Sequence, residues 1–484
     1  MRTAYRVATV RAAEAALMAR LPAGTLMRRA AAGLAAASAG LLGRTYGTRV
    51  AVLAGSGDNG GDALYAGARL ARRGAAVTAV LLSPDRAHPG GLAALRGAGG
   101  RVVAAPEAGG DAEAVLAGAD LVLDGIVGIG GRGGLRPSAV PLVRAAEAGG
   151  AVIVAVDLPS GVDADTGEVS GAAVRAHATV TFGAYKPALL IDPARERAGA
   201  VRLVDIGLGP LLPPRPDVVA LQHAEVAALL PRPTAESDKY RRGVVGVAAG
   251  SARYPGAAVL AVAGALRGGA GAVRYVGHAA DAVLARHPET LVSAEGPARA
   301  GRVQAWAVGP GLGDGPEARR AVAEALDSGV PLVVDADGLR LLDPERTAAR
   351  EAPVVLTPHA GEAARLLARD RAKVEAARLA AVRELADRYG ATVLLKGSTT
   401  LVAEPGDGPV RVNPTGTGWL ATAGSGDVLT GLVGALLAAG LAAGDAAAVG
   451  AYLHGLAGRL AEAPPTASTV AAALPAAWRS VDGD

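Results

Sequence analysis

The chain has 484 residues, of which 51% are hydrophobic and 3% aromatic, and it contains 68 Gly, 30 Pro and no Cys. This length predicts two or more domains and excludes a single small module, and the apolar fraction excludes a disordered chain. The absence of cysteine excludes a disulfide scaffold, a thiolate metal site and a cysteine nucleophile. A formal net charge of +4 on a chain this long gives no reason to expect nucleic acid as a partner.

The basic residues are unevenly divided, because only four of the 49 are lysines: Lys186, Lys239, Lys373 and Lys396. Mutational bias toward arginine codons explains the excess of arginine and says nothing about function. A site that needs a compact point charge instead of a planar fork resists such drift. We therefore treat the four lysines as markers of candidate sites.

An uncharged segment, Ala30–Gly43, follows Arg28 and Arg29 near the start of the chain. A twin-arginine export signal or a membrane anchor can begin in this way. However, these 14 residues are too few for a helix that spans a bilayer, which takes about 20, and they are rich in Ala and Gly. We expect a buried helix here, a cytoplasmic protein and no membrane partner.

Short apolar runs that end in Gly, Asp or Ser alternate with longer stretches of helical period, a pattern typical of βαβ units in an open parallel sheet. The sequence therefore predicts an α/β protein. In the first half the expected strands are Val50–Ala54, Val77–Leu82, Leu121–Leu123, Val152–Val156 and Thr179–Phe182. In the second half they are Val244–Ala249, Val273–Val276, Trp306–Val308, Leu332–Val334, Val354–Leu356 and Val393–Leu395, and a long Ala/Leu-rich helix follows Gly426.

A proline-rich stretch separates the two halves. Between Gly209 and Pro233 it carries Pro210, Pro213, Pro214, Pro216, Pro231 and Pro233. Because proline lacks the amide proton that helices and sheets use, we expect no helix or strand to run through this stretch. The predicted domains are residues 1–212 and 234–484, with a proline-rich linker at 213–233.

A glycine-rich turn follows the first predicted strand. It reads Gly55-Ser56-Gly57-Asp58-Asn59-Gly60-Gly61-Asp62 and leads into a predicted helix, Ala63–Arg73. Glycines at such a turn let backbone amides approach a phosphate, although a plain tight turn has the same composition. The side-chain oxygens of Asp58, Asn59 and Asp62 suit a hard cation or sugar hydroxyls better than a phosphate, which carboxylates repel.

Two further predicted strands end in carboxylates. Asp124 precedes a second glycine-rich loop, and Asp157 precedes Leu158-Pro159-Ser160-Gly161-Val162-Asp163. Because the carboxyl ends of parallel strands line one crevice, these groups can converge on one ligand. Structural capping of the elements that follow is the alternative interpretation. The combination of two strand-end acids with two glycine-rich loops favours a site.

Four segments together resemble the N-terminal domain of the NAD(P)H-hydrate epimerases, which form part of bifunctional NAD(P)H-hydrate repair enzymes. They are the Asp58–Asp62 turn, the loop after Asp124, the segment Asp157–Gly167, and Phe182-Gly183-Ala184-Tyr185-Lys186-Pro187. The resemblance implies a Rossmann-like three-layer domain in which Asn59, Asp124 and Ser160 hold a potassium ion. It also implies that Asp157 acts at the reacting ring, with Lys186 in the wall of the catalytic site.

The same resemblance assigns binding of the hydrated dinucleotide to Asp157 and to two loops. The loop residues are Asp58, Asn59, Gly60, Gly61, Asp62, Gly128, Ile129, Gly130, Gly131, Arg132, Gly133 and Gly134. The chain departs from the family pattern at Asp58, where many members have a second Asn, and at Ala63, where they have Gly.

The second half carries strand-end motifs of its own. Gly250–Ala258, Val308–Gly313 and Leu332–Gly338 each place small residues at the end of a predicted strand, where a ligand can approach the backbone. Leu356-Thr357-Pro358-His359-Ala360-Gly361-Glu362 places a histidine at another strand end. That histidine can hydrogen-bond a polar ligand or cap the next helix.

Two motifs near the end of the chain predict phosphate chemistry. Lys396-Gly397-Ser398-Thr399-Thr400 offers a cation, amides and hydroxyls together, as nucleotide phosphates require. Ala423-Gly424-Ser425-Gly426-Asp427 exposes amides at a helix N-terminus, which form an anion hole for a transferring phosphate, and Asp427 can take a hydroxyl proton. The alternative is that Asp427 is only a structural N-cap. The presence of Lys396 and His359 at other strand ends disfavours this alternative.

These motifs, with the start Lys239-Tyr240-Arg241-Arg242-Gly243, resemble the ribokinase-like superfamily and, within it, the ADP- or ATP-dependent NAD(P)H-hydrate dehydratases. The resemblance implies a ribokinase-like α/β domain in which Ala257, Gly311, His359 and Asp427 contact the hydrated nicotinamide nucleotide. It implies that the adenine nucleotide is held by Lys396, Gly397, Ser398, Thr399, Thr400 and Gly426. The family usually has Thr where this chain has Ser425, and Pro where it has Ala360.

Both resemblances together imply metabolite repair. The first half is expected to interconvert the R and S hydrates of NADH and NADPH, and the second to dehydrate the S form at the expense of ADP or ATP, with Asp427 as base. We expect potassium in the first half, Mg²⁺ with the nucleotide in the second, small-molecule partners and a homo-oligomer. Two alternatives remain: a ribokinase-like kinase of a vitamin precursor fused to a nucleotide-binding domain, and a non-catalytic nucleotide sensor. Retention of the candidate base together with the anion hole disfavours the sensor.

Overall fold

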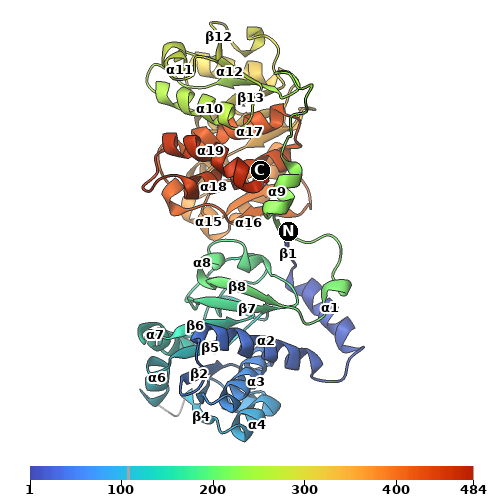
Figure 1. The fold of residues 1–484 in the computed structure, drawn as a ribbon, viewed down its shortest axis with the longest axis vertical. Coiled ribbons are helices and arrows are strands. Elements are labelled where there is room, and N and C mark those ends of the chain that lie inside the picture. Colours follow the sequence, from blue (N-terminus) through green and yellow to red (C-terminus); the bar gives the residue numbers. More distant parts are fainter. Residues whose placement is uncertain (106–109, 483–484) are drawn as a thin grey trace. The chain divides into compact units, whose positions relative to one another are not determined.

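The computed structural model describes residues 1–105 and 110–482, which fall into two compact units. The first unit comprises Thr3–Asp217, and the second comprises Val218–Asp484 together with Met1–Arg2. Figure 1 gives the course of the chain through both. Each unit has a sheet and a hydrophobic core of its own, so the predicted α/β class is confirmed.

The first unit is built on a seven-stranded sheet in which every pair of neighbours runs parallel, in the order β4-β3-β2-β5-β6-β7-β8. The five predicted strands are present as β2 (Arg49–Ala54), β3 (Ala76–Leu81), β5 (Leu121–Gly125), β6 (Val152–Val156) and β7 (Ala178–Phe182). The sequence analysis missed the edge strands β4 (Arg101–Ala104) and β8 (Ala200–Val204). Both are partly exposed, and their apolar runs are short, because β4 starts with Arg101 and β8 is interrupted by Arg202.

Helices cover both faces of this sheet, which makes the unit three-layered. Val50 and Val52 of β2 share a core with α2, α3 and α4, whereas Ala51 and Leu53 share another with α6 and α7. This alternation is the two-residue period of a strand buried on both sides. The helices are α1 (Val7–Met18), α2 (Thr25–Leu42), α3 (Asp58–Arg72), α4 (Pro89–Gly97), α6 (Gly110–Ala117), α7 (Val140–Ala148) and α8 (Ala194–Ala198), with 3-10 turns η1 (Pro84–Arg86), η2 (Pro137–Ala139), η3 (Pro187–Leu189) and η4 (Gly209–Leu211).

The second sheet has the order β1-β9-β18-β17-β16-β15-β14-β13-β10-β11-β12. All six predicted strands are present. The sheet is mixed, however, because β17 runs antiparallel to both β16 and β18. The strands are β1 (Arg2–Ala4), β9 (Val218–Ala220), β10 (Val244–Ala248), β11 (Ala272–Val276), β12 (Leu291–Ser293), β13 (Ala305–Val308), β14 (Leu332–Val334), β15 (Val354–Leu356), β16 (Thr392–Leu395), β17 (Thr400–Ala403) and β18 (Val410–Asn413).

A cluster of small apolar residues from α10, α17, α18 and α19 packs against one face of this sheet. α12 contacts β13, and α16 contacts β16 and β17. The helices are α9 (His223–Leu229), α10 (Pro255–Arg267), α11 (Ala280–Arg286), α12 (Pro316–Leu326), α13 (Pro344–Ala348), α14 (Ala360–Leu366), α15 (Arg371–Ala376), α16 (Arg378–Tyr389), α17 (Ser425–Ala438), α18 (Ala443–Leu460) and α19 (Ala467–Asp482), with 3-10 turns η5 (Pro297–Arg299), η6 (Ala336–Leu341) and η7 (Gly418–Leu420).

The proline-rich stretch differs from its prediction. The boundary between the two units falls between Asp217 and Val218 in the sequence. We expected residues 213–233 to form a linker without helix or strand, but they contain β9 and α9. The physical reason lies in the spacing of the prolines, because none occurs between residues 217 and 230. In that interval Gln222 and Glu225 form a capping box that starts α9. Residues 483–484 of the predicted second domain lie outside the described residues.

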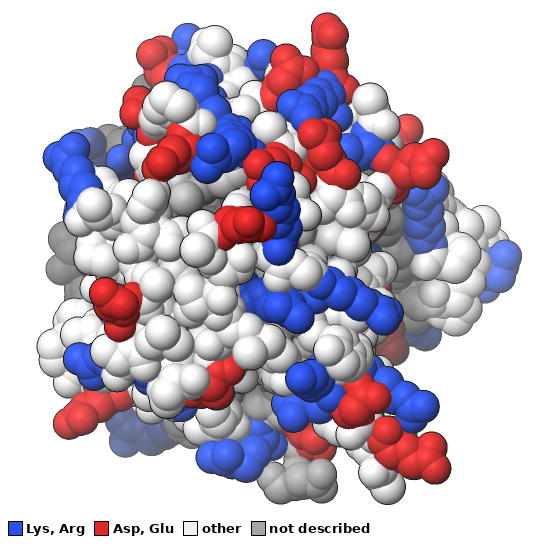
Figure 2. All heavy atoms as spheres, turned by 90° about the horizontal axis from the view of Figure 1, so that it is seen from above, with Lys and Arg blue, Asp and Glu red and all other residues white. Residues whose placement is uncertain are grey.

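The uncharged segment near the start of the chain is helical as predicted, in α2, where Ala31 and Leu34 are fully buried. A search of the described helices finds none with the length and apolar character needed to cross a membrane. Figure 2 shows one face, on which Lys and Arg lie interspersed with Asp and Glu.

Candidate functional site

The glycine-rich turn of the first unit is shorter than predicted, because α3 begins at Asp58 and not at Ala63. Gly57 precedes the helix with φ 105°, a conformation that favours glycine, and Asp58 places a carboxylate in the first helical turn. A Cβ on Gly60 would lie 2.4 Å from the carbonyl oxygen of Gly55, so glycine is needed for this close approach. Asp58–Asp62 therefore form a helix N-terminus at the carboxyl end of β2.

Asn59 joins this helix start to the second glycine-rich loop. With its side-chain amide oriented so that both polar groups are satisfied, Asn59 donates to Val156 O at 2.9 Å and accepts from Gly128 N at 3.2 Å. The loop then folds on itself, with Gly131 N donating to Gly128 O and with Gly133 and Gly134 at positive φ. The predicted loops Asp58–Asp62 and Gly128–Gly134 thus lie together.

Asp124 and Ser160 form a buried pair. Ser160 Oγ donates to Asp124 Oδ1 at 2.6 Å and Ser160 N donates to Oδ2 at 2.8 Å, while Ser160 Oγ also lies 3.1 Å from Val127 O. Burial raises the pKa of Asp124 to about 6, against the opposing hydrogen bonds from Ser160. Asp124 forms no ion pair with any residue in 1–105 or 110–482. A buried carboxyl, a hydroxyl and a carbonyl form a donor set that fits a hard cation such as potassium.

Asp157 and Lys186 form the second buried pair of this unit. Lys186 is 1% exposed, and its Nζ donates to Asp157 Oδ1, to Thr181 Oγ1 (3.0 Å) and to Phe182 O (3.1 Å). Thr181 Oγ1 and Phe182 N also donate to Asp157 Oδ1. Asp157 Oδ2 has no hydrogen-bond partner among the described residues, so it is the oxygen that remains for a ligand. Asp157 has φ 67°, a strained backbone conformation typical of functional sites.

Two further carboxyls lie in this charge cluster. Burial, followed by the charges of Asp157, Asp58 and Glu14, raises the pKa of Asp62 well above its usual value, and its Oδ1 is buried without a hydrogen-bond partner. Burial also raises the pKa of Glu14, although Lys186 opposes it. Glu14 was not predicted as a site residue, because it lies on α1, far from any motif. Its only signal is that it is the sole acid in that helix.

In the second unit, a buried ion pair joins two strand ends. Asp335 follows β14 and is 1% exposed, and Lys396 follows β16. Lys396 Nζ donates to Asp335 Oδ1 at 2.7 Å, and Thr430 Oγ1 of α17 donates to Oδ2 at 2.7 Å. Burial alone would lower the pKa of Lys396, but Asp335 and Glu362 raise it on balance. Lys396 is therefore a fixed positive charge.

Asp427 lies in the first turn of α17, beside this ion pair. Burial, followed by the negative charge of Asp335, raises its pKa to about 7, against the opposing charge of Lys396. A Cβ on Gly426 would lie 3.3 Å from Lys396 Nζ, so the helix start approaches the ammonium group closely. The predicted residues Lys396, Gly426 and Asp427 are thus brought together. A base with a pKa near 7 is well matched to proton transfer at neutral pH.

His359 caps the next helix, α14, which was one of the two roles expected for it. Its Nδ1 accepts from Gly361 N (2.9 Å) and Glu362 N (3.3 Å), while His359 N donates to the Glu362 carboxylate. Burial lowers the pKa of His359, which favours the neutral ring. With Nδ1 accepting, the ring proton is assigned to Nε2, which lies 3.5 Å from Glu362 Oε1.

Ala257 and Gly311 also meet, because a Cβ on Gly311 would lie 2.7 Å from that of Ala257. These residues join the start of α10 to the loop after β13. The start of α10 in turn contacts the start of α17, since a Cβ on Gly424 would lie 2.3 Å from Leu260 Cδ1. Residues 396–399 form the connection between the antiparallel strands β16 and β17, and Thr400 is the first residue of β17.

The comparisons with known proteins agree with this geometry. A family model described as NAD(P)H-hydrate dehydratase matches residues 245–477, and one described as YjeF-related protein N-terminus matches residues 23–188. The chain is 52% identical over 471 residues to the bifunctional NAD(P)H-hydrate repair enzyme of Mycobacterium leprae, covering 96% of this chain and 95% of that one. The chain belongs to the bifunctional NAD(P)H-hydrate repair enzymes. The repair enzyme of Escherichia coli is 36% identical over 427 residues, covering 84% of this chain and 79% of that one.

Solved structures resemble the second unit of this repair-enzyme chain. The ADP/ATP-dependent NAD(P)H-hydrate dehydratase of Bacillus subtilis, co-crystallised with ATP/Mg²⁺, matches with a TM-score of 0.51 and 31% identity over 55% of this chain and 99% of that one. A ribokinase-like superfamily protein from Enterococcus faecalis matches with a TM-score of 0.50 and 23% identity over 55% of this chain and 98% of that one. The predicted ribokinase-like fold is confirmed.

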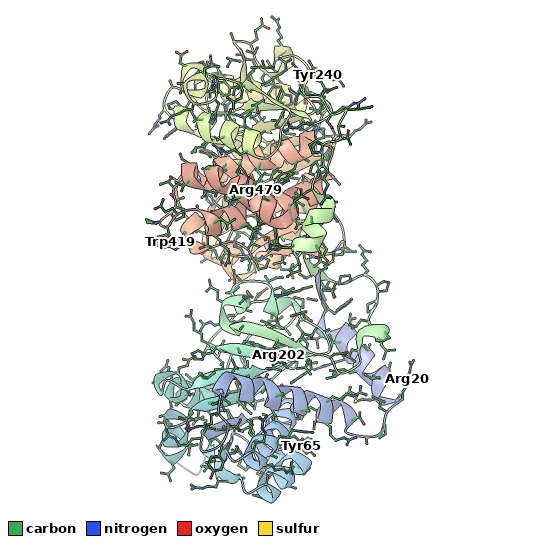
Figure 3. The ribbon with its side chains drawn as sticks, viewed as in Figure 1. Arg20, Tyr65, Arg202, Tyr240, Trp419 and Arg479 are labelled. Atoms are coloured by element: carbon green, nitrogen blue, oxygen red, sulfur yellow. The ribbon has the colours of Figure 1, made fainter. Side chains whose placement is uncertain are left out.

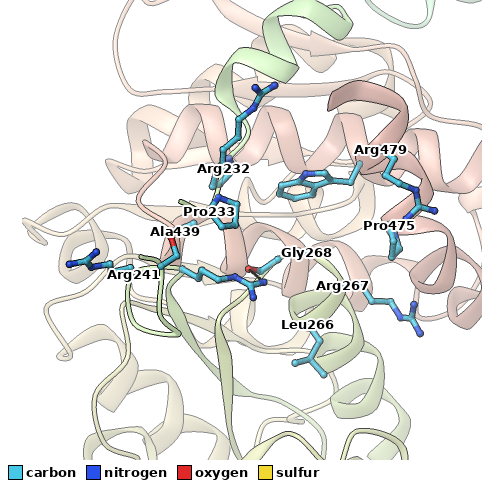
Figure 4. A pocket seen from close by; sticks show the side chains of 14 residues that line it. Arg232, Pro233, Arg241, Leu266, Arg267, Gly268, Ala439, Pro475 and Arg479 are labelled. Carbon is cyan, nitrogen blue, oxygen red and sulfur yellow. Dashed lines mark hydrogen bonds between the residues drawn. The ribbon is translucent and has the colours of Figure 1, made fainter. Parts of the chain in front are cut away.

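A cavity of about 480 Å³ is lined in part by Arg241 and Arg242 of the Lys239–Gly243 motif, but not by the motifs at the starts of α10 and α17 (Figure 4). It is lined by Leu266 and Gly268 at the end of α10 and by Ala439 at the end of α17, whereas the motifs occupy the beginnings of both helices. Five arginines line it: Arg232, Arg241, Arg242, Arg267 and Arg479. In Figure 4 the labelled arginines extend in different directions. Arginine near a helix C-terminus complements the negative end of the helix dipole, which explains Arg267 without a ligand.

Residues 1–105 and 110–482 contain no group of three or more His, Asp or Glu placed to hold a metal ion. A potassium site at Asp124 would therefore rest on one carboxyl and neutral oxygens. Magnesium is commonly held by one or two carboxylates together with substrate phosphates, and Asp427 and Glu362 beside Lys396 fit that arrangement.

Proposed function

We propose that the second unit dehydrates the S hydrate of NADH or NADPH by transient phosphorylation, with Asp427 as the base. The observation that carries this proposal is the position of Asp427, with a pKa of about 7, in the first turn of α17 beside the Lys396–Asp335 ion pair. The hydroxyl on C6 of the hydrated ring is a poor leaving group. Conversion to a phosphate ester makes it a good one.

The proposed reaction has two steps. In the first, Asp427 takes the hydroxyl proton while the oxygen attacks the terminal phosphorus of ADP or ATP, releasing AMP or ADP. In the second, the C6–O bond breaks, phosphate leaves with the bonding electrons, and C5 loses a proton to restore the C5–C6 double bond. Amides at the start of α17 and the Lys396 ammonium stabilise the negative charge that moves during transfer. Magnesium that enters with the nucleotide supplies further charge neutralisation at the phosphates.

In the proposed site, residues 396–400 and Gly426 hold the adenine nucleotide, and Ala257, Gly311 and the Nε2 proton of His359 meet the hydrated nicotinamide nucleotide. The contact between Ala257 and Gly311, and the approach of Gly426 to Lys396, support this division. Asp335 orients Lys396, because its two oxygens are held by Lys396 and Thr430.

For the first unit we propose exchange of the R and S hydrates by acid–base chemistry at Asp157. Asp157 gives a proton to the hydroxyl, which leaves C6 as water while the lone pair of the ring nitrogen forms a C=N bond. Water then adds to the opposite face and returns a proton to Asp157. The free Oδ2 of Asp157 and the neighbouring Lys186 support this role. Asp58–Asp62 and Gly128–Gly134 would bind the dinucleotide. Asn59, Asp124 and Ser160 would hold potassium, which supplies fixed charge at the loop junction. A cytoplasmic homo-oligomer remains a prediction.

The second-unit proposal is tested with Asp427→Asn in the full chain. We expect dehydration of the S hydrate with ADP and Mg²⁺ to fall by about 10²–10⁴-fold, because the amide cannot take the hydroxyl proton. Exchange of R and S by the first unit should remain unchanged. Asp281→Asn is the matched control, since Asp281 is an exposed acid in the first turn of α11. Dehydration at the wild-type rate in Asp427→Asn would refute the proposed base.

A further inference from the structure

Arg378 differs from the other arginines in its burial. It is the first residue of α16 and is 7% exposed, and it is the one arginine among the buried polar residues of the described chain. Burying a guanidinium group is costly unless its donors are satisfied, because the group stays charged at all accessible pH values. Arg378 belongs to no sequence motif, so nothing in the sequence marks it as a candidate.

The guanidinium group of Arg378 faces residues 395–399, the turn that carries the predicted nucleotide-binding residues. Its Nη2 donates to Thr399 O at 3.0 Å and to Lys396 O at 3.1 Å, with Leu395 O at 3.4 Å. These carbonyls stand at the start and the end of the turn between β16 and β17. One side chain therefore ties both ends of the turn together.

Glycine at position 397 makes this contact possible. A Cβ on Gly397 would lie 2.3 Å from Arg378 Nη2, so any larger residue would displace the guanidinium group or the turn. The peptide bond is planar and trans, so its C=O and N–H point in opposite directions. Because Lys396 O faces Arg378, the Gly397 N–H of the same peptide points away from it. Gly397 N has no hydrogen-bond partner among the described residues, so it is available to an anion.

We propose that Arg378 is a positioning residue for adenine-nucleotide binding, which holds residues 396–399 so that the Gly397 amide and the Lys396 ammonium face the nucleotide phosphates. This inference rests on the proposed nucleotide role of that turn. Arg378 itself does not touch the nucleotide: it acts through the carbonyls of Lys396 and Thr399. A lysine at this position carries a compact, more strongly hydrated ammonium group, which costs more to bury against these carbonyls.

The test compares Arg378→Ala, Arg378→Lys and a matched control, Arg388→Gln, in the full chain. Arg388 lies on the same helix and donates to a carbonyl, Leu366 O at 2.8 Å, but is exposed. We expect KM for ADP to rise on the order of ten- to a hundredfold in Arg378→Ala and less in Arg378→Lys, by analogy with other hydrogen bonds to charged groups. The kcat at saturating ADP and KM for the hydrate should stay near wild type. Guanidinium ion at low concentration should restore KM for ADP in Arg378→Ala alone.

Direct binding gives a readout that does not depend on turnover. Trp419 is 59% exposed (Figure 3) and lies in η7, three residues after Gly416, where a Cβ would lie 2.8 Å from Ser398 O of the turn. ADP should alter its fluorescence, with a weaker apparent affinity in Arg378→Ala. Trp419→Phe checks the assignment of the signal.

The possible failures can be told apart. If wild type and Arg388→Gln bind ADP but do not use it to dehydrate the hydrate, the proposed function fails while the binding test of Arg378 still stands. An unchanged affinity for ADP in Arg378→Ala would overturn the inference. The inference would also be overturned if kcat fell and KM rose for both ADP and the hydrate, with a lower unfolding midpoint and no rescue by guanidinium. That pattern indicates a general structural role.

Discussion

Each unit contains a Lys–Asp ion pair at the ends of its strands, and the two pairs differ in their exposure to solvent. In the first, Lys186 pairs with Asp157, and its side chain is 2% exposed. In the second, Lys396 pairs with Asp335 at 2.7 Å, and its side chain is 19% exposed. Lys186 forms an ion pair with one carboxylate only, whereas Lys396 also lies near Glu362 and the start of α17. An ammonium group that must reach an incoming phosphate has to keep such an open side.

In each unit a second aspartate lies beside the ion pair and forms no salt bridge with any described residue. These are Asp62 and Asp427, and in both burial is the largest cause of a raised pKa, with the paired aspartate adding to it. In each unit the lysine is thus paired with one carboxylate, while burial raises the pKa of the other carboxyl. Acid–base catalysis commonly uses neighbouring carboxyls whose surroundings give them different pKa values.

The largest effect should follow from Lys186→Met. This change leaves Asp157 buried without its cation, and removing one partner of a buried ion pair typically costs about 3–5 kcal/mol. We expect the first unit to unfold at a lower denaturant concentration and R–S exchange to be lost, while dehydration of the S hydrate persists. Unfolding followed by circular dichroism and both activity assays would reveal this. Wild-type stability in Lys186→Met would contradict the buried pairing.

Lys396→Met should destabilise its unit less, by about 1–3 kcal/mol, because the side chain of Lys396 is 19% exposed and that of Lys186 is 2% exposed, so solvent screens the unpaired Asp335 better. Dehydration should nevertheless be lost with the ammonium group. Lys373→Met is the matched control, since Lys373 is exposed and pairs with Asp370 on the surface. Equal destabilisation by Lys186→Met and Lys396→Met would remove the difference drawn between the two pairs.

The pH dependence of dehydration should report the carboxyl beside the second pair. Asp427 acts as a base only when ionised, so kcat/KM should fall as pH drops through about 7, the pKa of Asp427. Asp335→Asn removes a neighbouring negative charge, which lowers the pKa of Asp427 and should move the acid limb to lower pH. The measurement is the pH profile of each protein at equal ionic strength. A limb that stays in place would show that another group is titrating.

The smallest effect should come from potassium. If the ion binds at Asp124, concentrations about ten times its Kd should stabilise the first unit by about 1.4 kcal/mol relative to choline chloride at the same ionic strength. Asp124→Asn should abolish the difference, and the second unit should not respond. The unfolding midpoint of each unit in the two salts is the quantity to measure. Equal stabilisation of the Asp124→Asn protein would place the ion elsewhere.

Motifs adjacent in sequence were predictable, and partners distant in sequence were not. The predicted strands and the residues at their ends were found because buried parallel strands are apolar runs that stop abruptly at polar residues. The pairing of Lys396 with Asp335 joins positions 61 residues apart, and no local pattern encodes it. Glu14 and Arg378 lie on helices whose role is set only by the packing of those helices. The edge strands β4 and β8 were missed because they are half exposed.

The central claim is that two sites act in sequence on one substrate. The most direct measurement incubates a mixture of R and S hydrates of NADH with the full chain, ADP and Mg²⁺, and follows the near-ultraviolet absorbance of the reduced nicotinamide together with the amount of each epimer. Wild type should return both epimers to NADH, and Asp157→Ala should consume the S form and leave the R form at its uncatalysed rate of exchange. Consumption of the R form at the wild-type rate by Asp157→Ala would contradict the account.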